Sequence, residues 1–347
     1  MIVVVSLSLL IYFIGRKVGY SRARRFVLIL LLLGFVVLSH LVLPAGNPIV
    51  VITGGSLAEW MVVVGLVLLG AGYLSVLKRV KSAADTKADK LRSMETPLFS
   101  NSELDRYARH IMLREIGGPG QKALKEAKVL VIGAGGLGAP VLSYLGAMGV
   151  GTIGVIDDDD VENSNLQRQV IHTDARIGMP KVFSAQEALV AQNPYVDVRP
   201  YHRRLTPADA ETLFADYDVI LDGTDNFATR YLVNAAAAKA GKPLVSGALS
   251  QWEGQLSVFD PAHGTPCYQC VFPEAPAEGL APSCAEAGVS AALPGVIGSM
   301  MAQEAMKLIT GAGQSLKGEM FFYDALYADT RKITLRKRDD CPVCSTL

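Results

Sequence analysis

The stretch Gly133-Ala134-Gly135-Gly136-Leu137-Gly138 decides the fold. It follows an apolar run at 129–132, which predicts a buried strand, and it opens an apolar run at 137–148, which predicts a helix. A glycine-rich turn between strand and helix indicates a phosphate site, because the free amides at the helix N-terminus can bind an anion. A second apolar run, 151–156, ends at Asp157, where a carboxylate can bind ribose hydroxyls.

This unit alone fits an NAD- or FAD-binding enzyme as well as an ATP-binding one. The polar turn Ser164-Asn165-Leu166-Gln167-Arg168-Gln169 favours ATP. An arginine eleven residues after Asp157 has no evident use in hydride transfer, whereas an enzyme that handles a triphosphate needs such a cation.

The chain beyond residue 101 alternates helical and extended patterns. Helices are expected at 103–116, 121–127, 137–148, 181–192 and 227–240, and strands at 128–132, 151–156, 196–203 and 218–222. This alternation predicts an α/β fold, a Rossmann-like nucleotide-binding domain with helices on both faces of a mostly parallel sheet. Further strands at 244–248, 254–259, 319–323 and 330–336 would extend it as a mixed sheet.

The first 77 residues predict a membrane anchor of two or three transmembrane helices that precedes this domain. The apolar runs 26–43 and 57–77 would be about 27 Å and about 32 Å long as helices, against a hydrocarbon core of about 30 Å. Residues 2–15 are apolar but short. A cleaved signal peptide is the alternative for them, although a basic start and an Ala-x-Ala cleavage site are both missing.

Charge predicts the orientation of this anchor. Residues 1–92 carry a net charge of +8, with basic clusters at 16–25 and 78–92 and no Lys or Arg at 44–56. The positive-inside rule then predicts a multi-pass protein of the inner membrane, with the loop 44–56 outside, a linker at 78–100 and the domain 101–347 in the cytoplasm. Residues 93–347 carry −8, which argues against a nucleic-acid partner.

Six motifs in this order closely resemble the MoeB/ThiF branch of the ubiquitin-activating-enzyme superfamily, over roughly residues 100–345. Besides the glycine loop they are Arg106-Tyr107-Ala108-Arg109, Asn165-Leu166-Gln167-Arg168-Gln169 with Gly178-Met179-Pro180-Lys181, Thr224-Asp225-Asn226, Cys267-Tyr268-Gln269-Cys270 and Cys341-Pro342-Val343-Cys344. A membrane anchor is a departure from the pattern of that family.

The resemblance implies an ATP site, Mg²⁺ and a homodimer. It assigns Asp157 to the ribose, Asp225 to Mg²⁺, and Arg109 to the γ-phosphate of the neighbouring subunit. Gly136 would lie beside the nucleotide. The nucleotide-binding residues expected from the matching motifs are Gly136, Asp157, Ser164, Asn165, Leu166, Gln167, Arg168, Lys181, Asp225 and Asn226.

Each of these residues also has an ordinary structural alternative. Asp157 can cap a strand end or be solvated, and Arg168 can be a solvated residue of a polar turn. Asp225 can be a helix N-cap. Lys181 opens a predicted helix, where its charge opposes the helix dipole, and this placement favours a functional reason.

The five cysteines fall as two Cys-x-x-Cys pairs plus Cys284. The pairs Cys267/Cys270 and Cys341/Cys344 have the spacing of a closed, structural Zn²⁺ site with four thiolates. The resemblance matches Cys284 to the cysteine that many relatives present to the activated carboxylate, and a passive surface thiol is the alternative.

The function that the resemblance implies is ATP-dependent adenylation of the C-terminal glycine of a ubiquitin-like sulfur carrier, for sulfur transfer in cofactor biosynthesis. The sequence stops soon after Cys344 without a rhodanese-like segment, so a separate sulfur donor is expected, a cysteine desulfurase or a rhodanese-like protein. One alternative is a tRNA threonylcarbamoyladenosine dehydratase-like enzyme, against which the zinc cysteines count. Another is a membrane-tethered nucleotide-binding sensor without catalysis, which loss of Asp225 or Arg168 would have favoured.

Overall fold

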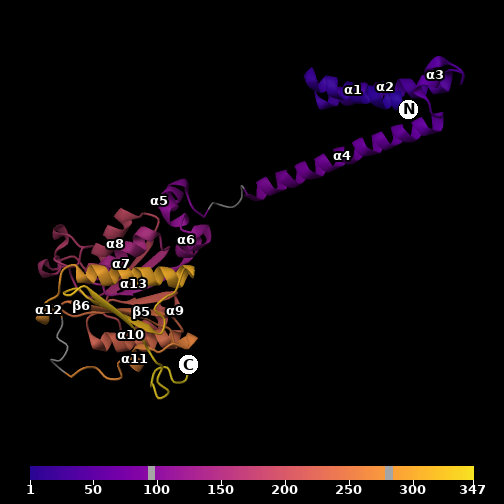
Figure 1. Cartoon of the computed structure of the whole chain (residues 1–347). Coiled ribbons are helices and arrows are strands. Elements are labelled where there is room, and N and C mark those ends of the chain that lie inside the picture. The colour runs from indigo at the N-terminus through magenta and orange to yellow at the C-terminus, as the bar shows by residue number, and fades with distance from the viewer. Residues whose placement is uncertain (93–97, 278–283) are drawn as a thin grey trace. The chain divides into compact units, whose positions relative to one another are not determined.

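A computed structural model describes residues 1–92, 98–277 and 284–347, with the side chains of 82–92, 284 and 285 left out. The chain divides into two compact units, Met1–Pro97 and Leu98–Leu347 (Figure 1).

The first unit contains four described helices. They are α1 (Ile2–Lys17), α2 (Arg22–Val42), α3 (Pro48–Thr53) and α4 (Leu57–Arg92). α1 and the start of α4 pack on α2 through a small apolar cluster formed by Val4, Leu33, Val36 and Trp60. The Met1 amino group donates a hydrogen bond to the Thr53 carbonyl, and the Trp60 indole N–H donates to the Gly54 carbonyl at 2.8 Å. The N-terminus and the 44–56 segment therefore lie at one end of this unit.

Two of the described helices are long and apolar enough to cross a membrane, judged by length and composition alone. They are Arg22–Val42 and Leu57–Lys81. Helix α4 continues without a break to Arg92, so most of the segment expected to be a linker is helical. Residues 93–97 lie outside the described part of the chain.

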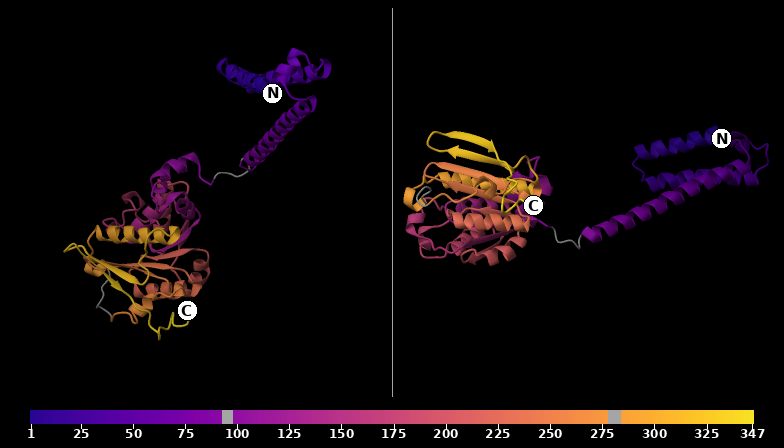
Figure 2. Two further views of the ribbon diagram at one scale, coloured as in Figure 1. Left: turned by 45° about the vertical axis from the view of Figure 1, so that its right-hand side comes forward. Right: turned by 90° about the horizontal axis from the view of Figure 1, so that it is seen from below.

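The second unit is built on an eight-stranded sheet in the order β3-β2-β1-β4-β5-β6-β7-β8. The first five strands in this order are parallel, and β6, β7 and β8 are antiparallel additions. Figure 2 shows the β7–β8 hairpin, in yellow, at the edge of the sheet. The strands are β1 (Lys128–Ile132), β2 (Thr152–Asp157), β3 (Asp197–His202), β4 (Val219–Asp222), β5 (Leu244–Leu249), β6 (Glu253–Phe259), β7 (Glu319–Asp324) and β8 (Asp329–Thr334).

Helices cover both faces of this sheet (Figure 1). One apolar core lies under α6 (Gly117–Glu126), α7 (Gly138–Met148), α8 (Lys181–Gln192) and α13 (Leu293–Thr310). The other lies under α9 (Pro207–Ala215), α10 (Phe227–Ala240) and α11 (Tyr268–Val271). The remaining helices are α5 (Asn101–Ile111) and α12 (Cys284–Ala287).

The predicted fold class is confirmed: the sheet is mixed, mostly parallel and covered on both faces. The expected helix 103–116 is wrong at its end, because α5 stops at Ile111 and α6 begins at Gly117 instead of residue 121. Gly117 has a φ of 58°, which allows the chain to turn between the two helices. Helices α9 and α13 were not predicted from the sequence.

Candidate functional site

A cavity of about 760 Å³ opens at the carboxyl ends of the parallel strands. It lies where the strand order reverses between β1 and β4, the position at which open α/β sheets bind ligands. The residues that line it fall into two groups by their place in the fold, here called arms. One arm consists of lining residues from the loops after β1, β2 and β4. The other runs past β5, β6 and β7 and includes Tyr268, Phe272, Phe322 and Arg331.

The glycine loop after β1 can be built only with glycine at two positions. Gly133 has a φ of 93°, which L side chains rarely adopt. A Cβ at Gly138 would lie 2.0 Å from the Gly133 carbonyl oxygen. The loop therefore turns tightly into α7, and Gly136 lines the cavity next to Pro294 of α13.

Asp157 lies at the end of β2 and lines the same arm. Its two carboxylate oxygens accept hydrogen bonds from the backbone N–H groups of Ala134 (2.7 Å) and Asp159 (2.8 Å). Burial raises the pKa of Asp157, and the nearby charge of Lys181 and these two N–H groups oppose the shift. Asp157 thus holds the backbone of two loops and also faces the cavity.

The polar turn contributes only part of its expected residues. Asn165 and Arg168 line the cavity, and Arg168 Nη1 donates to the Ser164 carbonyl at 3.1 Å. Ser164, Leu166 and Gln167 do not reach the cavity in the described structure.

Lys181 begins α8 with its side chain 7% exposed and its ammonium 2.6 Å from Asp159 Oδ2. Asp159 is itself largely exposed, and both residues line the cavity. Asp159 compensates the ammonium, whose position at the start of a helix opposes the helix dipole, and a phosphate in the cavity could be a second partner.

Asp225 does not cap a helix. The N-cap of α10 is Asn226, whose side-chain oxygen accepts from the Thr229 N–H at 2.8 Å. The structural alternative considered for Asp225, a helix N-cap, is therefore filled by Asn226. Both residues line the cavity. Asp225 is exposed and makes no hydrogen bond or ion pair with any other described residue.

Thr224, just before Asp225, makes three hydrogen bonds with Asp222 and Arg230, two residues that were not predicted from the sequence. Asp222 accepts from the Thr224 N–H (3.0 Å) and hydroxyl (2.6 Å). Arg230 donates to the Thr224 carbonyl and, at 2.9 Å, to the Gly247 carbonyl of β5.

Arg109 is not among the described residues that line this cavity. Arg109 is exposed on α5 and contacts no described residue through a hydrogen bond or ion pair. Cys284 begins α12, and its side chain lies outside the described residues.

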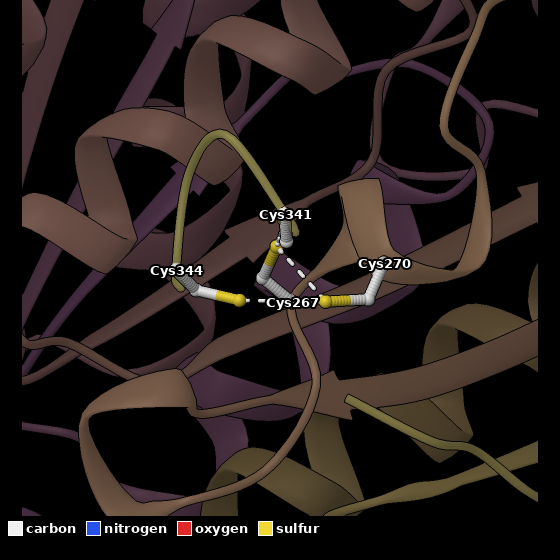
Figure 3. Close-up of side chains that lie close together, drawn as sticks. All are labelled: Cys267, Cys270, Cys341 and Cys344. Atoms are coloured by element: carbon white, nitrogen blue, oxygen red, sulfur yellow. Dashed lines mark hydrogen bonds between the residues drawn. The ribbon is translucent and has the colours of Figure 1, made fainter. Parts of the chain in front are cut away.

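The four paired cysteines converge in a second site (Figure 3). Cys267 Sγ is 3.9 Å from Cys270 Sγ and 3.6 Å from Cys341 Sγ, and Cys270 Sγ is 3.4 Å from Cys344 Sγ. A tetrahedral Zn²⁺ with Zn–S bonds of about 2.3 Å requires sulfur atoms ~3.8 Å apart.

Two N–H groups already point at these sulfurs. The Asn234 amide donates to Cys267 Sγ at 3.7 Å, and the Arg338 backbone donates to Cys270 Sγ at 3.5 Å. Burial raises the pKa of Cys267 to about 11. Burial also raises the pKa of Cys344, whereas the pKa of Cys341 is lowered to about 7, because its burial is outweighed by hydrogen bonds from the Val343 and Cys344 backbone. A bound metal ion stabilises the thiolate form. The donor set and its spacing therefore fit a closed metal site.

The model of the ThiF family matches residues 107–343. The sulfur carrier protein adenylyltransferase of Thermus thermophilus is 52% identical over 250 residues, which cover 71% of this chain and 92% of that protein. The probable adenylyltransferase/sulfurtransferase MoeZ of Mycobacterium tuberculosis is 53% identical over 252 residues, 72% of this chain but 64% of that longer protein.

Among solved structures, E. coli MccB with ATP has a similar fold. The TM-score is 0.61 at 22% identity, and the match covers 70% of this chain and 75% of that one.

Proposed function

Because the chain belongs to the ThiF family, we propose that it uses ATP to adenylate the C-terminal glycine of a ubiquitin-like sulfur carrier. Its Thermus thermophilus relative is named a sulfur carrier protein adenylyltransferase, which supports this reaction and this kind of substrate. One feature carries the proposal. The cavity joins an arm with phosphate-binding side chains to an arm along β5, β6 and β7 that can take an extended peptide tail. A site for a nucleotide alone would not need the second arm.

The reaction needs charge compensation more than covalent catalysis. A carboxylate oxygen of the carrier attacks the α-phosphorus, the bond to the bridging oxygen breaks, and pyrophosphate leaves with that electron pair. Arg168 and Lys181 would bind the phosphates, and Asp157 and Asn165 would orient the nucleotide. Asp225 is suited to be a Mg²⁺ ligand, because Mg²⁺ commonly binds one or two carboxylates together with phosphate oxygens. The bound Mg²⁺ would neutralise charge on the departing pyrophosphate.

Arg109 and Cys284 enter this proposal differently. The exposed, unpartnered Arg109 would complete the site of a second copy of the chain in a homodimer. Cys284 would form a thioester or an acyl disulfide with the carrier. In the thioester case its thiolate attacks the acyl carbon of the adenylate, the bond to the phosphate oxygen breaks and AMP leaves, before a separate donor supplies sulfur.

The four-cysteine site is proposed to hold one Zn²⁺ per chain. The thiolate set and the sulfur spacing support zinc, and a site closed by four protein ligands has a structural role.

The first unit is proposed to anchor the enzyme in the inner membrane with the second unit in the cytoplasm. The two long apolar helices and the basic clusters on either side of the uncharged loop support this orientation. The hydrogen bond between Met1 and Thr53 supports an extension of the proposal, in which the N-terminus lies on the same outer side as the 44–56 loop and α1 is a further crossing segment.

Asp225→Ala and Arg168→Ala are each expected to lower carrier-dependent exchange of labelled pyrophosphate into ATP by about a hundredfold or more, because each removes charge compensation at the phosphates. Asp216→Ala is the matched control, since Asp216 is exposed and lies outside the cavity. A carrier lacking its terminal glycine should give no exchange. Normal exchange by Asp225→Ala would contradict the assignment.

Arg109→Ala is expected to lose exchange activity alone and to regain part of it when mixed with Asp225→Ala subunits. A mixed dimer has one site with an intact Asp225 and an intact Arg109 from the other subunit. The measurement is the exchange rate after the two variants are co-expressed. Absence of complementation would show that Arg109 does not serve a neighbouring site.

Purified protein is expected to contain about one Zn²⁺ per chain by elemental analysis. Cys341→Ser should lose the metal and unfold at a lower temperature, because binding energy at a structural site contributes directly to folding. Cys284→Ser is the matched control and should keep the metal. Metal-free wild-type protein of equal thermal stability would rule the zinc site out.

A Gly46→Cys variant is expected to react with a membrane-impermeant maleimide in intact cells, whereas the wild-type protein should not. Gly46 has open space around it, so the substitution is tolerated there. A reporter fused after residue 92 should be active in the cytoplasm. Labelling of the wild-type cysteines in intact cells would place the enzyme outside and overturn the orientation.

A further inference from the structure

His172 is a buried imidazole that lies behind the glycine loop and does not line the cavity. It follows the turn that carries Asn165 and Arg168. Its Nε2 is 2.9 Å from the Ala134 carbonyl oxygen in the glycine loop, and its Nδ1 is 2.9 Å from Ser184 Oγ in α8. One side chain therefore connects three segments that contribute to the nucleotide arm.

The partners of the ring determine its tautomer. A carbonyl oxygen can only accept, so Nε2 carries the proton and donates to Ala134. In the neutral ring Nδ1 is then the acceptor, and the Ser184 hydroxyl donates to it. Burial lowers the pKa of His172, and the charges of Lys181 and Arg176 add to this effect, which agrees with a neutral ring.

The hydrogen bonds continue from Ala134 to the cavity. The Ala134 N–H donates to Asp157 Oδ2 at 2.7 Å, so this residue is held on one side by His172 and on the other by the expected ribose ligand. Ser184 lies three residues after Lys181 on α8. The Ala134 C=O and N–H belong to successive peptide units, so His172 and Asp157 together fix the two peptide planes on either side of the Ala134 Cα.

We propose that His172 is a positioning residue for nucleotide binding, which fixes the glycine loop and the bond from Ala134 to Asp157 by donating to the Ala134 carbonyl. The inference rests on the proposed function in one respect, that the nucleotide is ATP. Any buried imidazole must satisfy its ring nitrogens, so the position of the acceptor carries the inference: the Ala134 carbonyl lies between two glycines that line the cavity.

Three substitutions test the two hydrogen bonds of the His172 ring one at a time. His172→Gln places an amide near the Nε2 position and keeps a donor for Ala134. His172→Asn reaches only the Nδ1 position, so it keeps the Ser184 contact and leaves the Ala134 carbonyl without its donor. Ser184→Ala removes the other contact while the ring can still donate to Ala134.

The test is the Kd of the full-length protein for ATP and for AMP, measured by calorimetry without carrier, together with the unfolding temperature of the nucleotide-free protein. We expect His172→Asn to raise the Kd for ATP about tenfold, the equivalent of about 1.4 kcal/mol. The Kd for AMP should rise by the same factor, because AMP retains the ribose that Asp157 would bind. His172→Gln and Ser184→Ala should stay within about threefold of wild type.

The proposal is overturned if His172→Asn lowers the unfolding temperature but binds both nucleotides as wild type does, because the ring would then serve stability alone. Equal weakening by His172→Gln and His172→Asn would also overturn it, since the donor to Ala134 would not matter. A wild-type protein that binds NAD and not ATP would instead refute the proposed function.

Discussion

The buried ion pair between Asp222 and Arg230 holds together the strand ends on which the cavity depends. The two groups lie 3.5 Å apart and are almost inaccessible to water, so each charge must be compensated inside the protein. The compensation comes from Thr224, whose N–H, hydroxyl and carbonyl are all used, and from the Gly247 carbonyl of β5. The loop that presents Asp225 is thereby tied to the strand that begins the peptide arm.

The loop after β1 is fixed in a similar way, by Asp157 on one side and His172 on the other. Loops at the carboxyl edge of such a sheet are ordinarily its more mobile parts. Here buried polar side chains anchor both loops at the point where the strand order reverses. Charged groups held in advance of the substrate need little reorganisation when charge develops on the phosphates.

The sequence predicted those parts of the protein whose signal is local. Apolar runs of strand length, glycine spacing and two Cys-x-x-Cys pairs each depend on neighbours within a few residues. The start of α9 carried a readable signal too, a Thr206 cap followed by Pro207, and it was overlooked. Helix α13 was not predicted, because its first half contains two glycines and glycine disfavours helices in general. Gly298 is required there because a Cβ would lie 2.4 Å from Pro140 of α7. The roles of Arg230 and His172 depend on partners far away in the sequence, which spacing cannot reveal.

The cysteine site joins two segments that are distant along the chain. A cation held between Cys270 and Cys341 would close a loop of about 70 residues, and such closure lowers the conformational entropy of the unfolded chain. The loop contains Phe272 and the strand β7, and Phe272 and Phe322 of β7 line the cavity. Tyr268, which also lines it, lies between two of the ligands. A disulfide would give a comparable cross-link but does not persist where thiols are kept reduced. A metal–thiolate cross-link does persist there, so the wall of the peptide arm would depend on metal supply rather than on an oxidant.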